Sequence, residues 1–239
     1  SGSTIGGHYD PLLAKVIATG PTRADALRRL QRALADTVLF GLTTNLAYLR
    51  AIVAHPAFVE PHALSTRFLE EALPDWQPDV PLEEMNVALI AVALAQWHQQ
   101  AAGGPGYWRN NPGQPPPRRY RIGNATAEVT LRPVPHTAGH FTAALSPNET
   151  PRAVVGRVGN PPEIDLTLDG LRRRVVLAAA GDDWWAQTAA GPLLITALPL
   201  LPEPQGAGAS GGSLRAPLPG TVLAVLVEVG QAVAEGQPL

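Results

Sequence analysis

The sequence of 239 residues has no cysteine, one methionine and a single lysine, Lys15. Without cysteine, disulfides and thiol chemistry are excluded, which is compatible with a cytoplasmic location. The formal net charge is −2, so no strongly basic surface suggests nucleic acid or acidic lipid as a partner. A hydrophobic content of 45% with 16% charged residues is typical of globular proteins. We therefore expect a protein of the cytoplasm that buries a core.

Long hydrophobic runs are also missing. The longest apolar run, 87–95, has nine residues, which is about half of what a membrane-spanning helix needs. No stretch has the pattern of a secretory signal. We expect no membrane partner.

Residues 1–73 show a mixed α/β pattern. The apolar segment 8–18 is typical of a largely buried strand, and Thr22 is suited to cap the helix that follows. A second strand and two further helices are expected at 38–40, 45–54 and 65–73. Because a sheet of two strands is marginal, we expect its partner strands to lie before this sequence.

Residues 74–201 combine one apolar helix with many short strands. Nearly every residue of 85–94 is apolar, and a helix that is hydrophobic all round must be buried on all sides. Strand-like segments lie at 120–122, 127–131, 141–145, 153–158, 163–168, 172–178, 184–188 and 193–198. Asp169-Gly170 is a hairpin signal. We predict an antiparallel β-barrel of about eight strands around a buried helix, since closure removes exposed strand edges.

The remaining residues fall into two parts. Residues 202–213 have the Pro, Gly, Ala and Ser content of a flexible linker. Residues 214–239 begin a further β module, with a strand expected at 221–229. We expect this module to be incomplete at Leu239. The predicted fold class is therefore α+β and multidomain: a partial α/β unit, the barrel, and a partial β module of lipoyl or biotinyl type.

Several motifs carry a family resemblance. They are YDPLLAKVI at 9–17, GLTTN at 41–45, LRAIVAHPAF at 49–58, TRFLE at 66–70 and APLPG at 216–220. In this order they resemble the α subunit of the bacterial biotin-dependent acyl-CoA carboxylases, the acetyl-, propionyl- and methylcrotonyl-CoA group. The first four are similar to the C-terminal end of a biotin carboxylase domain, and the last to the start of a biotinyl carrier domain. By position, the central barrel corresponds to the BT domain.

The resemblance implies a ligase that carboxylates biotin with ATP, Mg and bicarbonate. The carboxyl group then passes to an acyl-CoA on a separate carboxyltransferase β subunit. In the family, biotin is attached to a lysine in an Ala-Met-Lys-Met turn, which we expect beyond Leu239. Lys15 lies in another domain, and the sequence has no Gly-x-x-x-x-Gly-Lys loop for phosphate. We therefore expect these 239 residues to hold no catalytic residue and no cofactor, and to dock the β subunit and tether the carrier.

Two groups of candidate site residues follow. Tyr107, Trp108 and Arg109 lie in a Gly/Pro-rich loop and are the residue types that dominate interface hot spots. In the family a hook-like loop at this place clasps the partner subunit, so we predict docking there; the alternative is that Trp108 plugs the barrel end. By analogy, Asp10 and Lys15 support the carboxylase site or self-association of α subunits. A structural ion pair or a role at a strand end is the alternative.

Other residue groups are less informative. His136 and His140 flank a loop-like sequence, so we expect no metal site there. The run 172–174 of three arginines is interpreted as a solvated strand face, with a CoA-binding or partner-binding patch as the alternative. Of Trp184 and Trp185, one is expected to point outward, because successive strand residues face opposite sides.

Two alternative functions stay open. One is a non-enzymatic β-barrel adaptor, whose carrier-like tail is incidental. The other is a urea or oxo-acid carboxylase of the biotin class. The adaptor is excluded if the gene continues past Leu239 into a biotin-accepting lysine motif and extends upstream into an ATP-grasp domain. Within the biotin class, retention by candidate carboxyltransferase subunits decides.

Overall fold

The computed structural model describes residues 2, 4–6, 8, 10–60, 64–102, 115–146, 149–158, 163–199, 225–234 and 237. The chain divides into two compact units, residues 1–200 and 201–239, and each is described by itself. In the second unit, residues 225–234 contain a turn but no helix or strand. The strand expected at 221–229 is therefore wrong for its described part, since the described residues of this unit include no second strand to pair with it.

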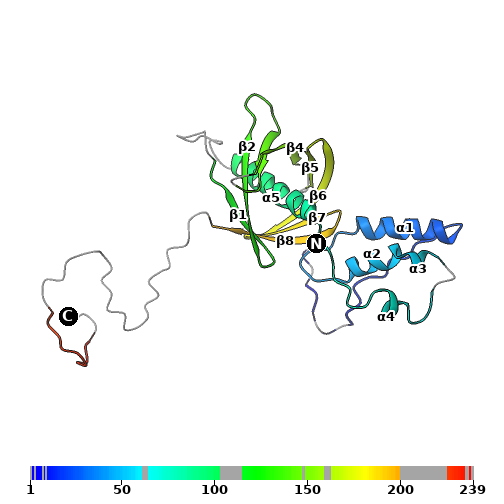
Figure 1. Cartoon of the computed structure of the whole chain (residues 1–239), viewed down its shortest axis with the longest axis horizontal. Helices are drawn as coiled ribbons and strands as arrows, with labels where there is room; N and C mark the ends of the chain where they lie inside the picture. Colours follow the sequence, from blue (N-terminus) through cyan, green and yellow to red (C-terminus); the bar gives the residue numbers. More distant parts are fainter. Residues whose placement is uncertain are drawn as a thin grey trace. The chain divides into compact units, whose positions relative to one another are not determined.

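The central feature of the first unit is a closed barrel of eight antiparallel strands (Figure 1). The strands are β1 (Arg118–Ile122), β2 (Ala125–Pro133), β3 (His140–Ala144), β4 (Arg152–Val158), β5 (Glu163–Leu168), β6 (Leu171–Ala180), β7 (Asp183–Thr188) and β8 (Gly191–Leu198). Each strand pairs with the next, and β8 pairs with β1. The predicted barrel and all eight predicted strands are confirmed.

Alternation of side chains explains how these strands close around a core. In β5, Ile164, Leu166 and Leu168 are buried while the residues between them are less so. The turn to β6 has Asp169 at φ 49° and Gly170 at φ 83°. Two residues with positive φ are what a type I′ hairpin requires, so the predicted Asp-Gly turn is confirmed.

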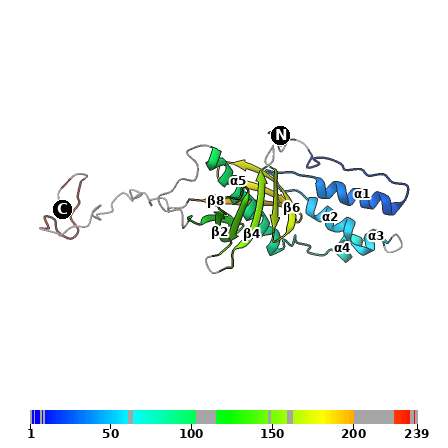
Figure 2. The ribbon, with the colours of Figure 1, turned by 90° about the horizontal axis from the view of Figure 1, so that it is seen from above.

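A single helix, α5 (Leu82–Ala102), runs through the barrel (Figure 2). From Val87 to Ala95 no residue is more than 5% exposed, as expected for a helix that is apolar on every side. Each large side chain buried in this way contributes roughly 1.5–3 kcal/mol. Gly156 lets β4 come close to the helix, because a Cβ at that position would lie 2.7 Å from Leu94 Cδ1.

Four shorter helices come before the barrel in the sequence: α1 (Arg23–Asp36), α2 (Leu46–Ala54), α3 (Pro56–Val59) and α4 (Phe68–Ala72). Thr22 caps α1 as predicted, since its hydroxyl accepts a hydrogen bond from the backbone N–H of Asp25 at 3.1 Å. The same hydroxyl donates to the Asp25 carboxylate at 2.8 Å and lowers the pKa of that group. A small core of Leu34, Leu46 and Val53 joins α1 to α2.

The strands predicted at 8–18 and 38–40 are wrong. Both segments lack strand assignment in their described residues. In the first, Leu12, Leu13, Val16 and Ile17 are exposed, although the apolar pattern predicted burial. A strand is stabilised by neighbours that complete its hydrogen bonds, and the described residues of 1–73 provide no sheet for them to join.

Candidate functional site

The predicted docking residues Tyr107, Trp108 and Arg109 lie outside the described residues. Asp10 and Lys15 are described, and both are exposed in the extended segment before α1. No ion pair among the described residues involves either of them.

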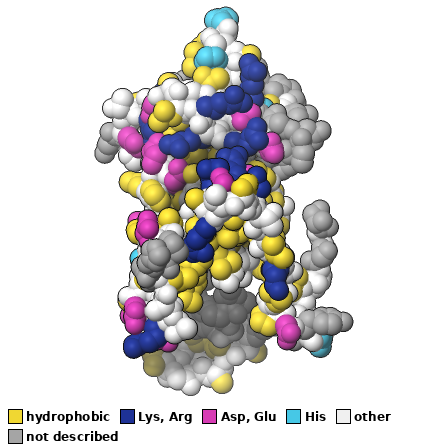
Figure 3. Space-filling model, turned by 90° about the vertical axis from the view of Figure 1, so that its right-hand side faces the viewer, with side chains coloured by type: hydrophobic (Ala, Val, Ile, Leu, Met, Phe, Trp, Pro, Cys, Tyr) yellow, Lys and Arg dark blue, Asp and Glu magenta, His cyan; other side chains and the backbone are white. Residues whose placement is uncertain are grey.

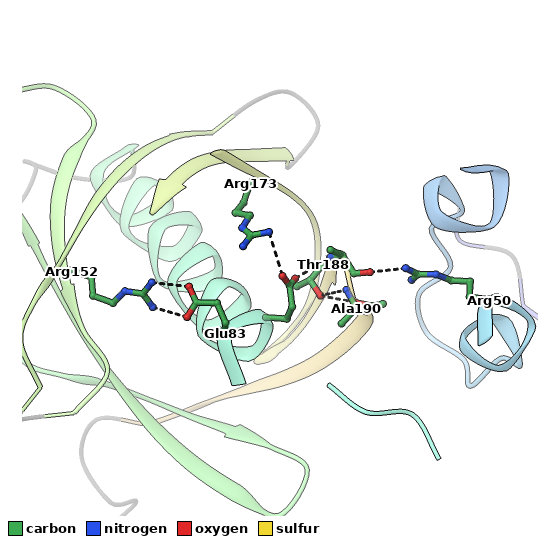
Figure 4. Close-up of polar contacts among 9 residues, drawn as sticks. Arg50, Glu83, Arg152, Arg173, Thr188 and Ala190 are labelled. Atoms are coloured by element: carbon green, nitrogen blue, oxygen red, sulfur yellow. Dashed lines mark hydrogen bonds and ion pairs between the residues drawn. The ribbon is translucent and has the colours of Figure 1, made fainter. Parts of the chain in front are cut away.

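The most connected polar cluster lies where α5 begins, at one end of the barrel (Figure 4). Glu83, in the first turn of α5, accepts two hydrogen bonds from the Arg152 guanidinium at 2.7 and 2.8 Å. Arg152 also donates to Asp169 in the β5–β6 turn at 2.6 Å. The hydrogen bonds from Arg152 hold the pKa of Glu83 below its usual value, and those to Glu83 and Asp169 raise the pKa of Arg152. The pair fixes the start of the helix to the wall of the barrel.

Glu84, the next residue of α5, joins the helix to the opposite wall. Its side chain is buried, with the residue only 8% exposed. Its carboxylate accepts a hydrogen bond from the backbone N–H of Ala189 at 3.1 Å and lies 3.6 Å from the Arg173 guanidinium. A buried carboxylate needs such partners, because its desolvation is costly without them.

The turn between β7 and β8, which carries Ala189, is also contacted by the region of the N-terminal helices. Arg50 of α2 donates to the Ala189 carbonyl oxygen at 2.7 Å (Figure 4). Phe40 stacks on Trp185 of β7 with ring centroids 6.1 Å apart. Trp184 is buried inside the barrel and Trp185 faces outward, so the predicted alternation is confirmed. The outward tryptophan is partly covered by Phe40 and does not form an open patch.

The arginine run on β6 divides by strand face. Arg172 and Arg174 are exposed and lie 3.2 and 3.7 Å from the same partner, Asp165 on β5. They fit the predicted solvated face. Arg173 points to the other side and is half-buried beside Glu84, which a solvated face does not explain.

This arrangement can hold elements together, but it offers no obvious reaction. Its carboxylates are paired with guanidiniums or backbone N–H groups. No group of three His, Asp or Glu side chains suited to a metal ion occurs within the described part of the chain. His136 and His140 are both exposed, and His136 lies in a turn at φ 60°.

The sequence lacks two motifs by which cofactors of the kind that the family resemblance implies are recognised. The one lysine, Lys15, is not flanked by methionine and lies in the segment before α1, so it does not match the family's biotin-attachment turn. The sequence contains no Gly-x-x-x-x-Gly-Lys loop for a nucleotide phosphate. No step of biotin or ATP chemistry is therefore assigned to these side chains.

Sequence reasoning missed the contacts of this cluster. The acidic pair Glu83 and Glu84 is recognisable as a feature of a helix N-terminus, but its partners Arg152 and Ala189 lie 69 and 105 positions away. No local pattern in the sequence points from either glutamate to its partner. Only the barrel topology shows that these ends meet.

Comparison with known proteins gives two family matches in this chain. The model "Biotin carboxylase C-terminal domain" matches residues 1–71. The model "Methylcrotonyl-CoA carboxylase, alpha-subunit, BT domain" matches residues 85–198, which include all of α5 after its first three residues and all eight strands of the barrel. None of the helices in the described residues is long and apolar enough to span a membrane.

Individual relatives agree with these matches. The propionyl-CoA carboxylase alpha chain of Ruegeria pomeroyi is 28% identical over the whole chain, which covers 36% of that protein. The methylcrotonoyl-CoA carboxylase subunit alpha of Dictyostelium discoideum is 24% identical over the whole chain, again covering 36% of it. The urea amidolyase of Lachancea kluyveri is 34% identical over 108 residues, or 45% of this chain and 5% of that protein.

The chain thus spans about a third of the length of the relatives that it matches from end to end. The two family matches follow one another along the chain in the order that the sequence motifs indicate, and the second match covers the barrel. The chain is therefore similar to the α subunits of biotin-dependent acyl-CoA carboxylases, with a region that matches a biotin carboxylase C-terminal domain followed by one that matches a BT domain.

Proposed function

We propose that the chain connects and docks the parts of an acyl-CoA carboxylase. The whole α subunit would carboxylate biotin with ATP, Mg and bicarbonate, in the cytoplasm. The carboxyl group would then pass to an acyl-CoA on a carboxyltransferase β subunit. This segment contributes the docking barrel between the carboxylase and the tethered carrier, which corresponds to residues 214–239. Association of α subunits with one another is compatible with this role, and neither nucleic acid nor membrane takes part.

The observation that carries the proposal is the barrel closed around α5. Its interior is filled mainly by apolar side chains of the helix and of the strands around it. Pairings of Glu83 and Glu84 fix the helix to two sides of the barrel. A rigid body of this kind, without a catalytic group among its described residues, suits recognition of a partner better than chemistry.

In contrast to the barrel, the carrier has to move between two sites. A carrier that visits two distant sites depends on its tether, because tether length sets its effective concentration at each site. The Pro, Gly, Ala and Ser composition of 202–213 suits such a tether. Docking by the barrel would fix the distance that the tether has to cover.

Binding to carboxyltransferase β subunits tests the proposal. The chain is immobilised, and propionyl-CoA and methylcrotonyl-CoA carboxylase β subunits are passed over it. In the double variant Trp108→Ala and Arg109→Ala, we expect binding to weaken by about tenfold or more, because residues of these types dominate hot spots. The control removes two exposed arginines from strands, Arg121→Ala with Arg157→Ala, and should bind normally.

Two results would contradict parts of the proposal. Unchanged binding of the Trp108 and Arg109 variant would leave Trp108 with a packing role and place docking elsewhere on the barrel. Failure of every acyl-CoA β subunit to bind, also with the rest of the α subunit present, would refute docking itself. The similarity to a urea amidolyase makes a urea-carboxylase branch the second candidate in that case.

A further inference from the structure

A cavity lined by arginines lies between the N-terminal helices and one end of the barrel, where residues of α5, β5, β6 and β7 line it. It has a volume of about 720 Å³, and its five arginines are Arg32 of α1, Arg50 of α2 and Arg172, Arg173 and Arg174 of β6. Small-molecule sites typically have volumes of about 300–1,000 Å³. In Figure 3, Lys and Arg side chains gather on the upper part of the molecular face that is turned toward the viewer. The cavity therefore has the size and the donors of a ligand site.

Gln187 adds a second, independent observation. It lines this cavity from β7 and is only 6% exposed, although its place in the strand turns it away from the barrel interior. Its amide nitrogen donates to the Thr188 carbonyl oxygen at 3.3 Å. Its oxygen Oε1 is buried without a hydrogen-bond partner among the described residues. A buried acceptor without a partner is costly, and a hydrogen-bond donor on a ligand would satisfy it.

The arginines that line the cavity keep N–H groups that are available to donate hydrogen bonds to a ligand. Arg172 and Arg174 share a single carboxylate, Asp165, and Arg50 is bonded to a backbone carbonyl. Each guanidinium has five N–H donors, of which these contacts use a minority. Two lining carboxylates, Asp36 and Glu84, are occupied by Arg32 and by Arg173 with the Ala189 N–H. Glu163 is the remaining acid of the lining.

We propose that this cavity binds a phosphorylated small molecule that also carries an N–H or O–H donor. The phosphate contacts Arg50, Arg172 and Arg174, because the guanidinium fork matches phosphate oxygens. The donor group bonds to Gln187 Oε1, an acceptor that a bare anion would leave unpaired. The proposal concerns a site apart from β-subunit docking and does not depend on it.

Isothermal titration calorimetry of the full chain with ADP tests the site. ADP supplies both the phosphate and the donors, pyrophosphate only the phosphate, and adenosine only the donors. We expect ADP to bind saturably in low salt with EDTA present, and more tightly than either fragment. Because the net charge is −2 and the sequence has no Gly-x-x-x-x-Gly-Lys loop, neither general attraction of anions nor a P-loop would account for such binding.

Variants separate the two halves of the site. Arg172→Ala with Arg174→Ala should weaken both ADP and pyrophosphate by about tenfold or more, because each removes charged hydrogen bonds. These side chains are 74% and 65% exposed, so the barrel core is not disturbed. Gln187→Met should weaken ADP several-fold and leave pyrophosphate unchanged.

The control variant Arg121→Ala with Arg157→Ala removes the same charge from exposed strand positions outside the cavity lining. It should bind ADP as the unaltered chain does. Absence of saturable ADP binding would overturn the proposal. So would an equal loss in the control, or normal ADP binding by the chain without Arg172 and Arg174.

Discussion

Nine consecutive residues of α5, Val87 to Ala95, are buried inside the barrel, whereas α1 and α2 together bury only Leu27, Leu34, Leu46 and Val53. The barrel closes on itself and satisfies the edges of all its strands. The N-terminal region instead leaves large apolar side chains exposed in its extended segment. The barrel thus completes its own sheet and core, whereas the region before it leaves apolar side chains in contact with solvent.

The strongest test of this comparison removes one large side chain from each core. Ile90→Ala leaves a cavity in the middle of the barrel, and we expect it to lower the free energy of unfolding by about 2–5 kcal/mol. Leu34→Ala affects a core of only three buried residues, and we expect about 1–2 kcal/mol. Urea unfolding followed by tryptophan fluorescence and by circular dichroism measures both. Equal losses would show that the two cores are equally important, against the comparison.

The ion pair of Glu83 with Arg152 provides a smaller, pH-dependent test. Glu83→Gln should lower the free energy of unfolding by about 1 kcal/mol at pH 7, since the Glu83 side chain is 44% exposed and solvent screens the pair. Arg152 holds the pKa of Glu83 below its ordinary value of 4.5. The carboxylate therefore stabilises the fold fully above pH 4.5, and this contribution is lost as pH falls through the folded-state pKa.

Urea unfolding midpoints of the unaltered chain and of the Glu83→Gln variant, measured between pH 3 and pH 7, would show this loss of stability. The difference between them should be largest at neutral pH and shrink toward pH 3. Glu128→Gln is the control, because Glu128 lies 3.6 Å from Arg119 and neither side chain is buried. A difference that stays constant over this range would mean that Glu83 acts by packing and not by its charge.

The same contrast explains how much of the fold the sequence predicts. Eight strands, the Asp169-Gly170 turn and the buried helix follow from local patterns: alternation, turn residues and an apolar run. They are confirmed because the barrel supplies every partner that those patterns need. The strand at 8–18 has an equally clear pattern, yet it is wrong here, because a strand also depends on neighbours that its own residues do not encode.

Site contacts are harder to predict than elements. Arg50 and Ala189 are 139 positions apart, and Glu83 and Arg152 are 69 apart. Nothing local in either pair signals the other member. For Trp184 and Trp185 the sequence predicts only that one of them points outward. The contact that covers Trp185 is not predictable locally, because Phe40 comes from another region.

The contact of Phe40 with Trp185 gives the smallest expected effect and tests the joint between the two regions. Phe40→Ala should cost at most about 1 kcal/mol, as stacked aromatic pairs contribute little beyond their buried area. It should also expose Trp185 and increase the quenching of tryptophan fluorescence by acrylamide. Leu39→Ala, beside it in the sequence and already 37% exposed, is the control and should change quenching little. In a Trp185→Phe background the effect of Phe40→Ala on quenching should disappear. If it persists there, Phe40 protects a different tryptophan, and the helices are not held to the barrel through β7.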